Sequence, residues 1–312
     1  MYIVPLTVVG IYTIIVHSTH NFDQKPAHWV MQPFFKDHTS YGAILAMFYP
    51  ITWAYLWSKN LSINTKIVIG VIIAILTLAI ILSYTRAAWV SLLGTLVVFG
   101  IVQFRVKWWI VIVMLGIGVG GYFSFEDQIF QKLEKNRQDS SDDIAEHVNS
   151  ISNVATDASN LERINRWSAA LRMFEERPIF GFGPGTYKFY YASYQHSSQL
   201  TIISTNFGNL GNAHSEYFGP LAEQGVLGLI TLLIIMGIAI YKFIVVYYDT
   251  KSLEMRIALM GAFLGWITYI VHGVLNNYLD LDKANVPFWG FLALLVAVEV
   301  YHKNKSDEAT AY

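Results

Sequence analysis

The amino-acid sequence predicts an all-α fold, a polytopic transmembrane helical bundle of about eight spans with one long extracytoplasmic segment. Three observations lead to this prediction: composition, the length of the apolar runs and the placement of basic residues. The chain is 54% hydrophobic and only 14% charged, which is too apolar for a soluble domain of this size. A net charge of -1 provides no field to attract nucleic acid, and the absence of cysteine excludes disulfides and a thiol nucleophile.

The apolar runs have lengths near the roughly 17 to 25 residues that cross a hydrocarbon core, although the first is short. They cover approximately residues 1–17, 40–57, 67–84, 87–104, 108–125, 224–248, 257–275 and 284–301. We therefore divide the chain into N-terminal transmembrane helices (1–125), an extracytoplasmic loop domain with an amphipathic helix (126–213), and C-terminal transmembrane helices with a cytoplasmic tail (214–312).

Basic residues are unevenly shared between the two sides of this predicted bundle. Alternating spans place on one side Lys59, Lys66, Arg105, Lys107, Lys242, Lys251, Arg256, Lys303 and Lys305. The short loops opposite hold only Lys25, Lys36, Arg86 and Lys283. By the positive-inside rule both termini are cytoplasmic, and the long 126–213 segment faces outward.

Arg86 lies in the very short reversal between the third and fourth spans, within Thr85-Arg86-Ala87-Ala88-Trp89. Two interpretations remain open: an interfacial arginine whose stem lies in the membrane, or a cation fixed where a lipid phosphate would lie. The preceding outer loop adds Asp37 and His38 as secondary candidates.

A helix is predicted to begin at Ser159, because Ser159-Asn160-Leu161-Glu162 fits a capping box. Residues at helical spacing give it one mainly apolar face that could lie against the bundle or the lipid surface: Leu161, Ile164, Trp167, Ser168, Leu171 and Phe174. Arg163 falls on the border of that face, while Arg166 is expected to turn further toward water. The Gly181–Gly185 segment that follows is either a plain turn series or a nest of amides for an anion.

The segment Asn212–Gly228 carries a histidine and two carboxylates at the edge of an apolar run. The imidazole of His214 titrates near neutrality and could accept a proton from a sugar hydroxyl, or it could be an ordinary interfacial histidine. Glu216 and Glu223 either orient that imidazole or are acidic residues near a helix start. Gly225 and Gly228 are spaced to let another helix pack closely.

Together these segments resemble the O-antigen ligase family. The resemblance rests on His214-Ser215 followed after nine residues by Gly225-Val226-Leu227-Gly228, on the Arg86 segment, and on Arg163-x-x-x-Trp167 followed by Pro178-Ile179-Phe180-Gly181-Phe182-Gly183. It spans roughly Tyr41 to the C-terminus. Leu229-Ile230 stand where many members have hydroxyl residues. Members usually have about a dozen spans, so we expect N-terminal helices to be missing from this chain.

The resemblance implies a bacterial inner-membrane glycosyltransferase with a periplasmic long loop. Its donor would be a glycan on undecaprenyl pyrophosphate and its acceptor the hydroxyl of a glycan, lipid (such as lipid A core) or protein. Arg86 and Arg163 would hold the pyrophosphate, and His214 would deprotonate the acceptor. The family is metal-independent and inverting, so we expect no metal or other cofactor.

Further substrate contacts are expected from Arg166, Trp167, Glu216, Asp280 and Asp282. The Asp280-Leu281-Asp282 pair resembles the Asp-x-Asp of metal-using glycosyltransferases, but we interpret it as an acceptor-side or structural pair. Oligosaccharide repeat-unit polymerases and protein O-oligosaccharyltransferases share the signature and remain alternatives. A flippase of lipid-linked glycans is a further alternative, although the span interiors lack the Asp, Lys or Arg typical of ion-coupled transporters.

Overall fold

The computed structural model describes residues 2–107, 158–200 and 211–310, together with positions 109, 110, 113, 116 and 204. The described part is helical and contains no strand. The chain forms two compact units. Unit 1 comprises residues 1–98, 233–273 and 278–312, and unit 2 comprises residues 99–232 and 274–277. Helix α5 (Arg86–Gln103) begins in unit 1, and helix α10 (Phe218–Asp249) begins in unit 2 and ends in unit 1.

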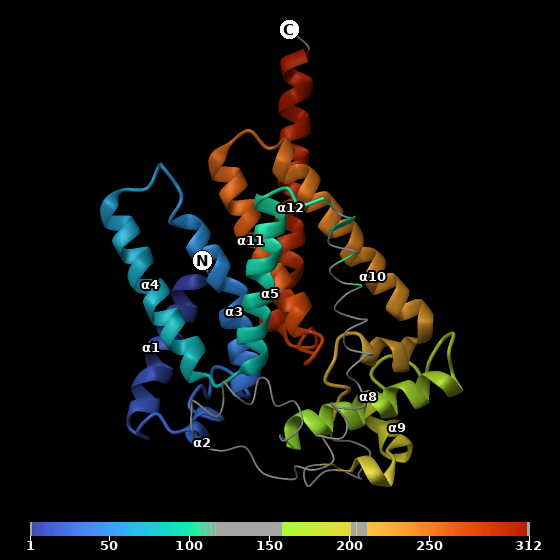
Figure 1. Ribbon diagram of the computed structural model, residues 1–312. Coiled ribbons are helices and arrows are strands. Elements are labelled where there is room, and N and C mark those ends of the chain that lie inside the picture. Colours follow the sequence, from blue (N-terminus) through green and yellow to red (C-terminus); the bar gives the residue numbers. More distant parts are fainter. Residues whose placement is uncertain are drawn as a thin grey trace. The chain divides into compact units, whose positions relative to one another are not determined.

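Unit 1 is a bundle of membrane-length helices (Figure 1). Besides the parts of α5 and α10 it contains α1 (Ile3–Ser18), α2 (Gln24–Ala27), α3 (His38–Tyr55), α4 (Ile63–Leu82), α11 (Leu253–His272) and α12 (Asp282–Thr310). Unit 2 contains α8 (Ala158–Glu176), α9 (Tyr187–Tyr194) and the short 3₁₀-helix η1 (Ser197–Gln199).

Seven of the predicted spans coincide with these helices, and most of the eighth, 108–125, lies outside the described residues. Five described helices are long and apolar enough to cross a membrane: α4, α5, α10, α11 and residues 282–301 of α12. Helix α1 is shorter, with 16 residues. Helix α3 is not among the five, because neighbouring helices cover it and its surface does not have to match lipid. The prediction of an all-helical membrane bundle is therefore confirmed, while the number of spans stays a prediction.

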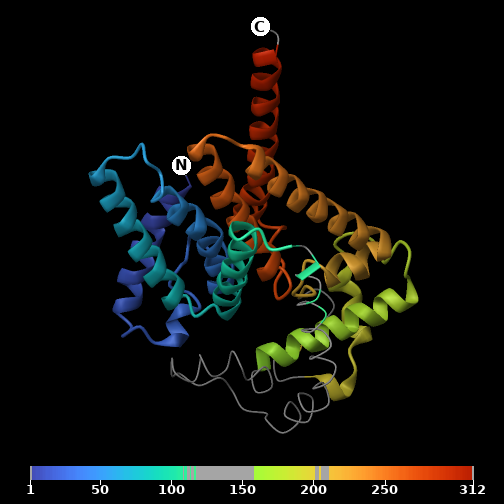
Figure 2. The same cartoon turned by 45° about the horizontal axis from the view of Figure 1, so that its top comes forward.

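The centre of unit 1 is the contact between α3 and α11, which run side by side in Figures 1 and 2. Gly261 and Gly265 form a Gly-x-x-x-Gly pair on α11 that lies directly against α3. A Cβ atom at Gly265 would lie 2.3 Å from the carbonyl oxygen of Met47, and one at Gly261 would lie 3.0 Å from Cα of Ile51. Small residues allow such close backbone approach, which replaces the hydrophobic driving force that helices lack in lipid.

Side-chain hydrogen bonds between helices add to this packing. The hydroxyls of Thr13 and Tyr41 join α1 to α3 at 2.7 Å, and those of Tyr49 and Thr77 join α3 to α4 at 2.8 Å. Near the other end of the bundle, the ammonium of Lys242 on α10 donates to the Glu299 carboxylate on α12 at 2.5 Å. Each bond satisfies polar atoms that would be costly to leave alone in a hydrocarbon environment.

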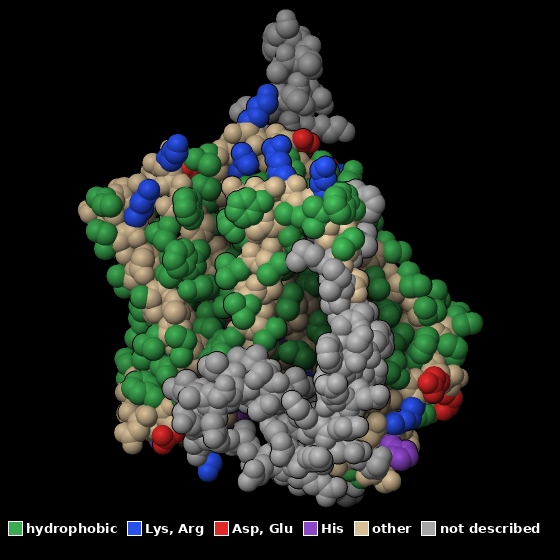
Figure 3. Space-filling view, viewed as in Figure 1, with side chains coloured by type: hydrophobic (Ala, Val, Ile, Leu, Met, Phe, Trp, Pro, Cys, Tyr) green, Lys and Arg blue, Asp and Glu red, His purple; other side chains and the backbone are tan. Residues whose placement is uncertain are grey.

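The surface of the bundle follows the charge pattern of the sequence. In Figure 3, Lys and Arg side chains gather at the upper edge, over the loops that join α3 to α4 and α10 to α11, while the flanks below are mainly hydrophobic. Those loops contain Lys59 and Lys251, and the first turns of α4 and α11 add Lys66 and Arg256. This distribution is typical of helices whose apolar flanks meet lipid and whose basic ends lie at a membrane surface.

Candidate functional site

Arg86 is the first residue of α5 and follows a tight reversal in unit 1. Tyr84 adopts the left-handed conformation (φ 50°), so the chain turns within residues 83–85. The Tyr84 hydroxyl donates to the carbonyl of Phe22 at 2.9 Å, and the Thr85 hydroxyl donates to the carbonyl of His38 at 2.8 Å. The reversal therefore fixes the backbone position of Arg86, whose side chain is half-buried. A cation at a helix N-terminus opposes the helix dipole, a cost that a bound anion at the same place would remove.

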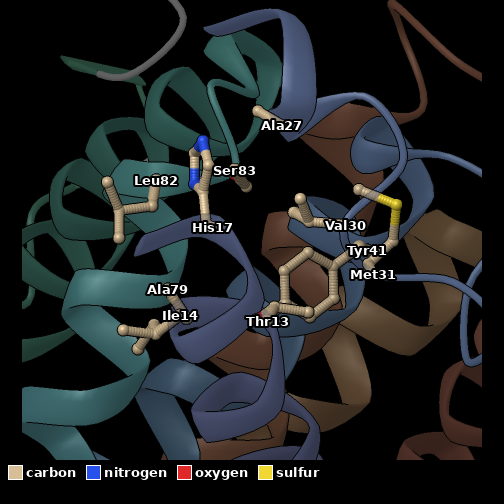
Figure 4. A pocket seen from close by; sticks show the side chains of 10 residues that line it. All are labelled: Thr13, Ile14, His17, Ala27, Val30, Met31, Tyr41, Ala79, Leu82 and Ser83. Atoms are coloured by element: carbon tan, nitrogen blue, oxygen red, sulfur yellow. The ribbon is translucent and has the colours of Figure 1, made fainter. Parts of the chain in front are cut away.

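The packing beneath this turn is nearly complete. A cavity of about 10 Å³, room for a single water molecule, lies among residues that include Thr13, His17, Tyr41 and Ser83 (Figure 4). The His17 ring is buried and its Nε2 lies 2.6 Å from the carbonyl oxygen of Asp23. The turn before Arg86 thus rests on a filled interior of unit 1 and is not a loop over a void.

Helix α8 organises unit 2. Its first described residue is Ala158, so the capping box at Ser159 stays a prediction. Its fully buried face is not the predicted apolar stripe, whose members remain half-buried or exposed. That buried face consists of Glu162, Asn165, Arg166, Ala169, Ala170 and Met173. The last two pack with Tyr187 and Tyr191 of α9. The stripe is therefore left for contacts beyond this small core.

The prediction that Arg166 turns toward water is wrong. Its side chain is 6% exposed and forms an ion pair with Glu162, Nε to Oε1 at 2.8 Å. Its Nη1 donates to the carbonyl of Asn212 at 3.0 Å, and the guanidinium lies 5.1 Å from the centre of the Tyr191 ring. Arg166 lies on the buried face of α8, between Glu162 and Ala170 along the helix. The Glu162 carboxylate, one turn earlier, compensates the buried charge of Arg166.

Arg163, in contrast, is half-buried, and its Nε donates to the carbonyl of Leu275 at 3.1 Å. Leu275 belongs to the 274–277 segment, which is part of unit 2. A guanidinium has five N–H donors in a rigid fork, so one bond through Nε orients the plane of the whole group. The predicted position of Arg163, at the border of the apolar face of α8, is consistent with this half-buried contact.

The His214 segment is held against α8. Arg166 binds the Asn212 carbonyl two residues before His214, and the Trp167 ring stacks on Phe218, four residues after it, with the ring centres 5.2 Å apart. His214 itself adopts the left-handed conformation (φ 47°), and its backbone N–H donates to Oδ1 of Asn212 at 3.1 Å. His214 therefore lies on a turn that packs against α8, the helix that carries Arg163.

The residues around His214 are buried polar groups. Ser215 is fully buried, and its Oγ accepts from the N–H groups of Tyr217 and Phe218 at 3.2 and 3.4 Å, which caps the start of α10. Glu216 is 8% exposed. Burial, followed by the Glu216 charge, raises the pKa of the Tyr217 hydroxyl to about 12, so this group stays protonated at neutral pH. Among the described residues the buried indole N–H of Trp167 finds no hydrogen-bond acceptor.

Glu223 does not reach toward the imidazole but binds the glycine-rich turn. Its carboxylate accepts from the backbone N–H of Gly185 at 2.8 Å and of Tyr187 at 2.9 Å. The amides of this turn do bind an anionic group, which is the Glu223 carboxylate. Backbone bonds strengthen the same contact, since Gly183 N–H donates to the Glu223 carbonyl at 2.7 Å and Val226 N–H to the Pro178 carbonyl at 2.8 Å.

Gly225 also serves this contact. It breaks the helical geometry of α10 with φ 66° and ψ -162°, and a Cβ atom there would lie 2.4 Å from the carbonyl oxygen of Ile179. Gly225 thus admits the turn after α8 instead of another helix, contrary to our expectation. At Gly228, a Cβ atom would meet only the flexible side chain of Gln224 in the same helix.

We expect Gly225→Ala to destabilise unit 2, because alanine would occupy a backbone region almost restricted to glycine, at roughly 1–3 kcal/mol, besides the clash with Ile179. The matched control is Gly237→Ala on the same helix, where a Cβ atom would meet nothing within 4 Å and alanine has the better helix propensity. Thermal unfolding of the detergent-purified protein measures both. Equal melting temperatures for the two variants would contradict this account of Gly225.

A second stability prediction concerns the buried ion pair. Arg166→Ala leaves the Glu162 carboxylate buried without its partner, and breaking such a pair costs about 3–5 kcal/mol. Arg177→Ala is the control, because its ion pair with Glu176 is long, 3.9 Å, and both side chains are more than half exposed. Circular dichroism during heating should show a large loss for the first variant and little change for the second. Replacing both partners, Glu162→Leu with Arg166→Met, should recover much of the loss.

Asp280 and Asp282 are both exposed in the loop before α12 and in its first turn. Asp282 is the first residue of α12, where a carboxylate interacts favourably with the helix dipole. Asp37 has a comparable role, since its side chain caps α3 by accepting from the N–H of Ser40 at 2.7 Å. Structural explanations therefore exist for Asp37 and Asp282.

The residues that the sequence analysis overlooked are those that hold the candidates in place. Asn212 receives Arg166 and supports the His214 backbone, and the Leu275 carbonyl receives Arg163. Asn212 had a detectable signal, because Asn two residues before another residue commonly forms a side-chain turn. The Leu275 carbonyl had no such signal, because it is more than a hundred residues from Arg163 in the sequence.

Arg86 belongs to unit 1, and Arg163 and His214 belong to unit 2, so the shared site that the resemblance implies for them stays a prediction. No curated protein matches this chain. The sequence profile described as O-antigen ligase matches residues 69–233, more than half of the 312 residues, and includes Arg86, Arg163 and His214. With that match, the apolar helices and the arginine and histidine segments in their expected order, the chain belongs to the O-antigen ligase family.

Proposed function

We propose that this multi-pass membrane protein is a metal-independent, inverting glycosyltransferase that moves a glycan from undecaprenyl pyrophosphate to an acceptor hydroxyl on the outer face of the bacterial inner membrane. The family supports the coarser statement, a membrane enzyme of ligase or polymerase type with a lipid-linked glycan and an acceptor as its partners. The chemistry of the three candidate residues leads to the finer one.

His214 acts as the general base in this proposal. Its imidazole takes the proton of the acceptor hydroxyl as the oxygen attacks the anomeric carbon. A new C–O bond forms on one face of the sugar while the bond between the anomeric carbon and the pyrophosphate oxygen breaks on the other, which inverts the configuration. The left-handed backbone at His214, tied to Asn212, keeps the imidazole in one position during attack.

The two arginines act on the donor. Pyrophosphate gains negative charge as it leaves, and a guanidinium donates paired hydrogen bonds to its oxygens without losing its own charge. Arg86 joins its charge to the N-terminus of α5, a position that itself favours an anion. Arg163 is oriented by the Leu275 carbonyl. Of the remaining expected contacts, Trp167, Glu216 and Asp280 would bind sugar hydroxyls of donor or acceptor. Arg166 instead supports the His214 segment, and Asp282 begins α12.

The observation that carries the proposal is the attachment of the His214 segment to α8. Arg166 and Trp167 contact residues on both sides of His214, and Arg163 lies on the same helix one turn before Trp167. If α8 made no contact with the His214 segment, Arg163 and His214 would belong to separate parts of unit 2. The contacts instead favour one working unit for the base and one arginine.

The direct test is to incubate the purified protein with lipid-linked oligosaccharide and separate candidate acceptors. Glycan transfer with stoichiometric release of undecaprenyl pyrophosphate is the expected result. The acceptor that receives the glycan distinguishes a ligase from a polymerase or a protein transferase. Movement of the donor across vesicles without release of pyrophosphate would instead identify a flippase.

We further expect transfer to survive chelation, because the arginines and not a divalent cation balance the leaving pyrophosphate. The rate should be the same within about twofold with EDTA and with added Mg²⁺ or Mn²⁺. A known metal-dependent glycosyltransferase under the same conditions serves as the control for chelation. If EDTA stops the reaction and a metal restores it, Asp280 and Asp282 become the better candidates for the catalytic centre.

A further inference from the structure

Unit 1 contains a second polar feature besides Arg86, a cavity of about 190 Å³ between the start of α3 and the start of α12. We call it the headgroup cavity. Its polar wall consists of Lys36, Ser40, Tyr278, Asp282 and Lys283. Its apolar wall consists of Phe35, Ile44, Leu281 and Ala284. The lining contains two lysines and one aspartate, a balance of charges that favours an anion.

Lys283 has two contacts within unit 1. The Lys283 ammonium donates to the backbone carbonyl of Phe34 and lies 4.9 Å from the centre of the Phe35 ring. An ammonium has three N–H groups, and this bond uses one of them. Lys36 follows Phe35 directly in the chain and is exposed. Both lysines are exposed residues of the cavity lining, which also includes apolar side chains.

A chain of hydrogen bonds connects this cavity to the Arg86 turn. The Tyr278 hydroxyl, on the cavity wall, binds the hydroxyl of Thr39, and the Thr85 hydroxyl binds the carbonyl of the adjacent His38. The cavity and the start of α5 thus lie at the same end of the unit 1 bundle, on either side of the first turn of α3. The headgroup cavity is consequently near the membrane surface where unit 1 helices end.

Helix α12 continues from the cavity with an apolar, exposed face. Val286 and Trp289 follow Lys283 at helical spacing and are 65% and 45% exposed, and a Cβ atom at Gly290 would meet nothing within 4 Å. A tryptophan at this depth is typical of the interface between headgroups and acyl chains. The polar cavity and the apolar stripe together match an amphiphile, with its charged head between the lysines and its chain along α12.

We propose that the headgroup cavity binds the phosphate group of a membrane lipid, with Lys36 and Lys283 as its ligands and the lipid chain on the Val286–Gly290 face of α12. A soluble phosphate would use the same cations but would gain nothing from the apolar face. The proposal concerns binding only and stands apart from glycan transfer. Its role would be to keep an anionic lipid beside the N-terminus of α3.

The experiment measures lipid retained by the delipidated, detergent-purified full chain after addition of phosphatidylglycerol, zwitterionic phosphatidylcholine or inorganic phosphate, by native mass spectrometry. Wild type should retain phosphatidylglycerol in preference to phosphatidylcholine. The double variant Lys36→Gln/Lys283→Gln should weaken that retention about tenfold, and Lys25→Gln, an exposed lysine of α2, should leave it unchanged. Lys36→Arg/Lys283→Arg should retain the lipid, which separates loss of charge from loss of fold.

The direction in which Asp282→Asn changes lipid retention distinguishes a bound phosphate from a bound sugar or cation. Removing the carboxylate takes a like charge away from a bound phosphate, so retention should tighten about two- to fivefold. A sugar or a cation held by Asp282 would respond in the opposite direction, and weaker or unchanged retention in this variant would overturn the proposal. Equal retention by the double lysine variant and by wild type would also overturn it. Competition by inorganic phosphate as strong as that by the lipid would identify free phosphate as the ligand. Because no glycan donor is present, the outcome does not depend on whether the chain transfers glycan.

Discussion

His214→Ala is expected to reduce glycan transfer by about 10²- to 10⁴-fold while leaving binding of the lipid-linked donor largely intact. The base acts on the acceptor hydroxyl, so its loss raises the barrier to attack without removing any contact to the donor phosphates. Single-turnover transfer of a labelled glycan measures the first quantity, and equilibrium binding of the labelled donor measures the second. A large loss of glycan transfer with nearly unchanged donor binding is the result that a general base specifically predicts.

The backbone at His214 requires a control of its own. Because His214 has φ 47°, alanine there adds backbone strain to the loss of the imidazole, and a distorted turn would also reduce activity. Asparagine tolerates the left-handed conformation, so His214→Asn keeps the turn but not the base. Both variants should be equally inactive. Recovery in His214→Asn would mean that the turn and not the base had been tested.

A matched histidine completes the design. His196 is an exposed histidine of the same unit, and His196→Ala should leave transfer unchanged. The general-base role is untenable if His214→Ala retains more than about a tenth of the wild-type rate, since one factor of ten is only about 1.4 kcal/mol of barrier. It is equally untenable if donor binding and transfer decline in parallel.

Much of this architecture could be predicted from local sequence. Apolar runs located seven described helices, because a helix that meets lipid must be apolar over its whole length. The helical spacing of apolar residues predicted a helix after Ser159, and α8 covers this region. The tight reversal before Arg86 followed from the absence of any chain to form a longer loop.

What could not be predicted depends on contacts between distant segments. The periodicity of α8 indicated its apolar stripe. The face buried within unit 2 instead carries the Glu162–Arg166 pair, which contacts from distant segments help to stabilise, among them the Asn212 carbonyl. Gly225 looked like a helix-packing residue, because spacing alone cannot distinguish a helix from a turn as the close neighbour. On α11 the same spacing, Gly261 and Gly265, does mark a helix contact.

The arginines should respond differently from His214. We expect Arg86→Ala and Arg163→Ala to weaken donor binding and also to slow transfer by about 10²- to 10³-fold, the range for removal of one donor that stabilises developing charge. Both effects follow from one role, since the guanidinium contacts the pyrophosphate before the reaction and balances the added charge during it. Donor binding and single-turnover rates, measured as for His214, provide the comparison.

Arg86→Lys tests which property of the side chain matters. Lysine keeps the charge at the start of α5 but cannot donate two parallel hydrogen bonds to phosphate oxygens, so this variant should remain clearly impaired. Lys107→Ala, an exposed cation beyond the opposite end of α5, is the control and should behave as wild type. Full activity of Arg86→Lys would reduce Arg86 to a source of charge. Unchanged donor binding in Arg86→Ala would remove it from the phosphate site and leave the interfacial arginine as the correct interpretation, since a cation that touched the pyrophosphate could not be deleted without cost to the bound donor.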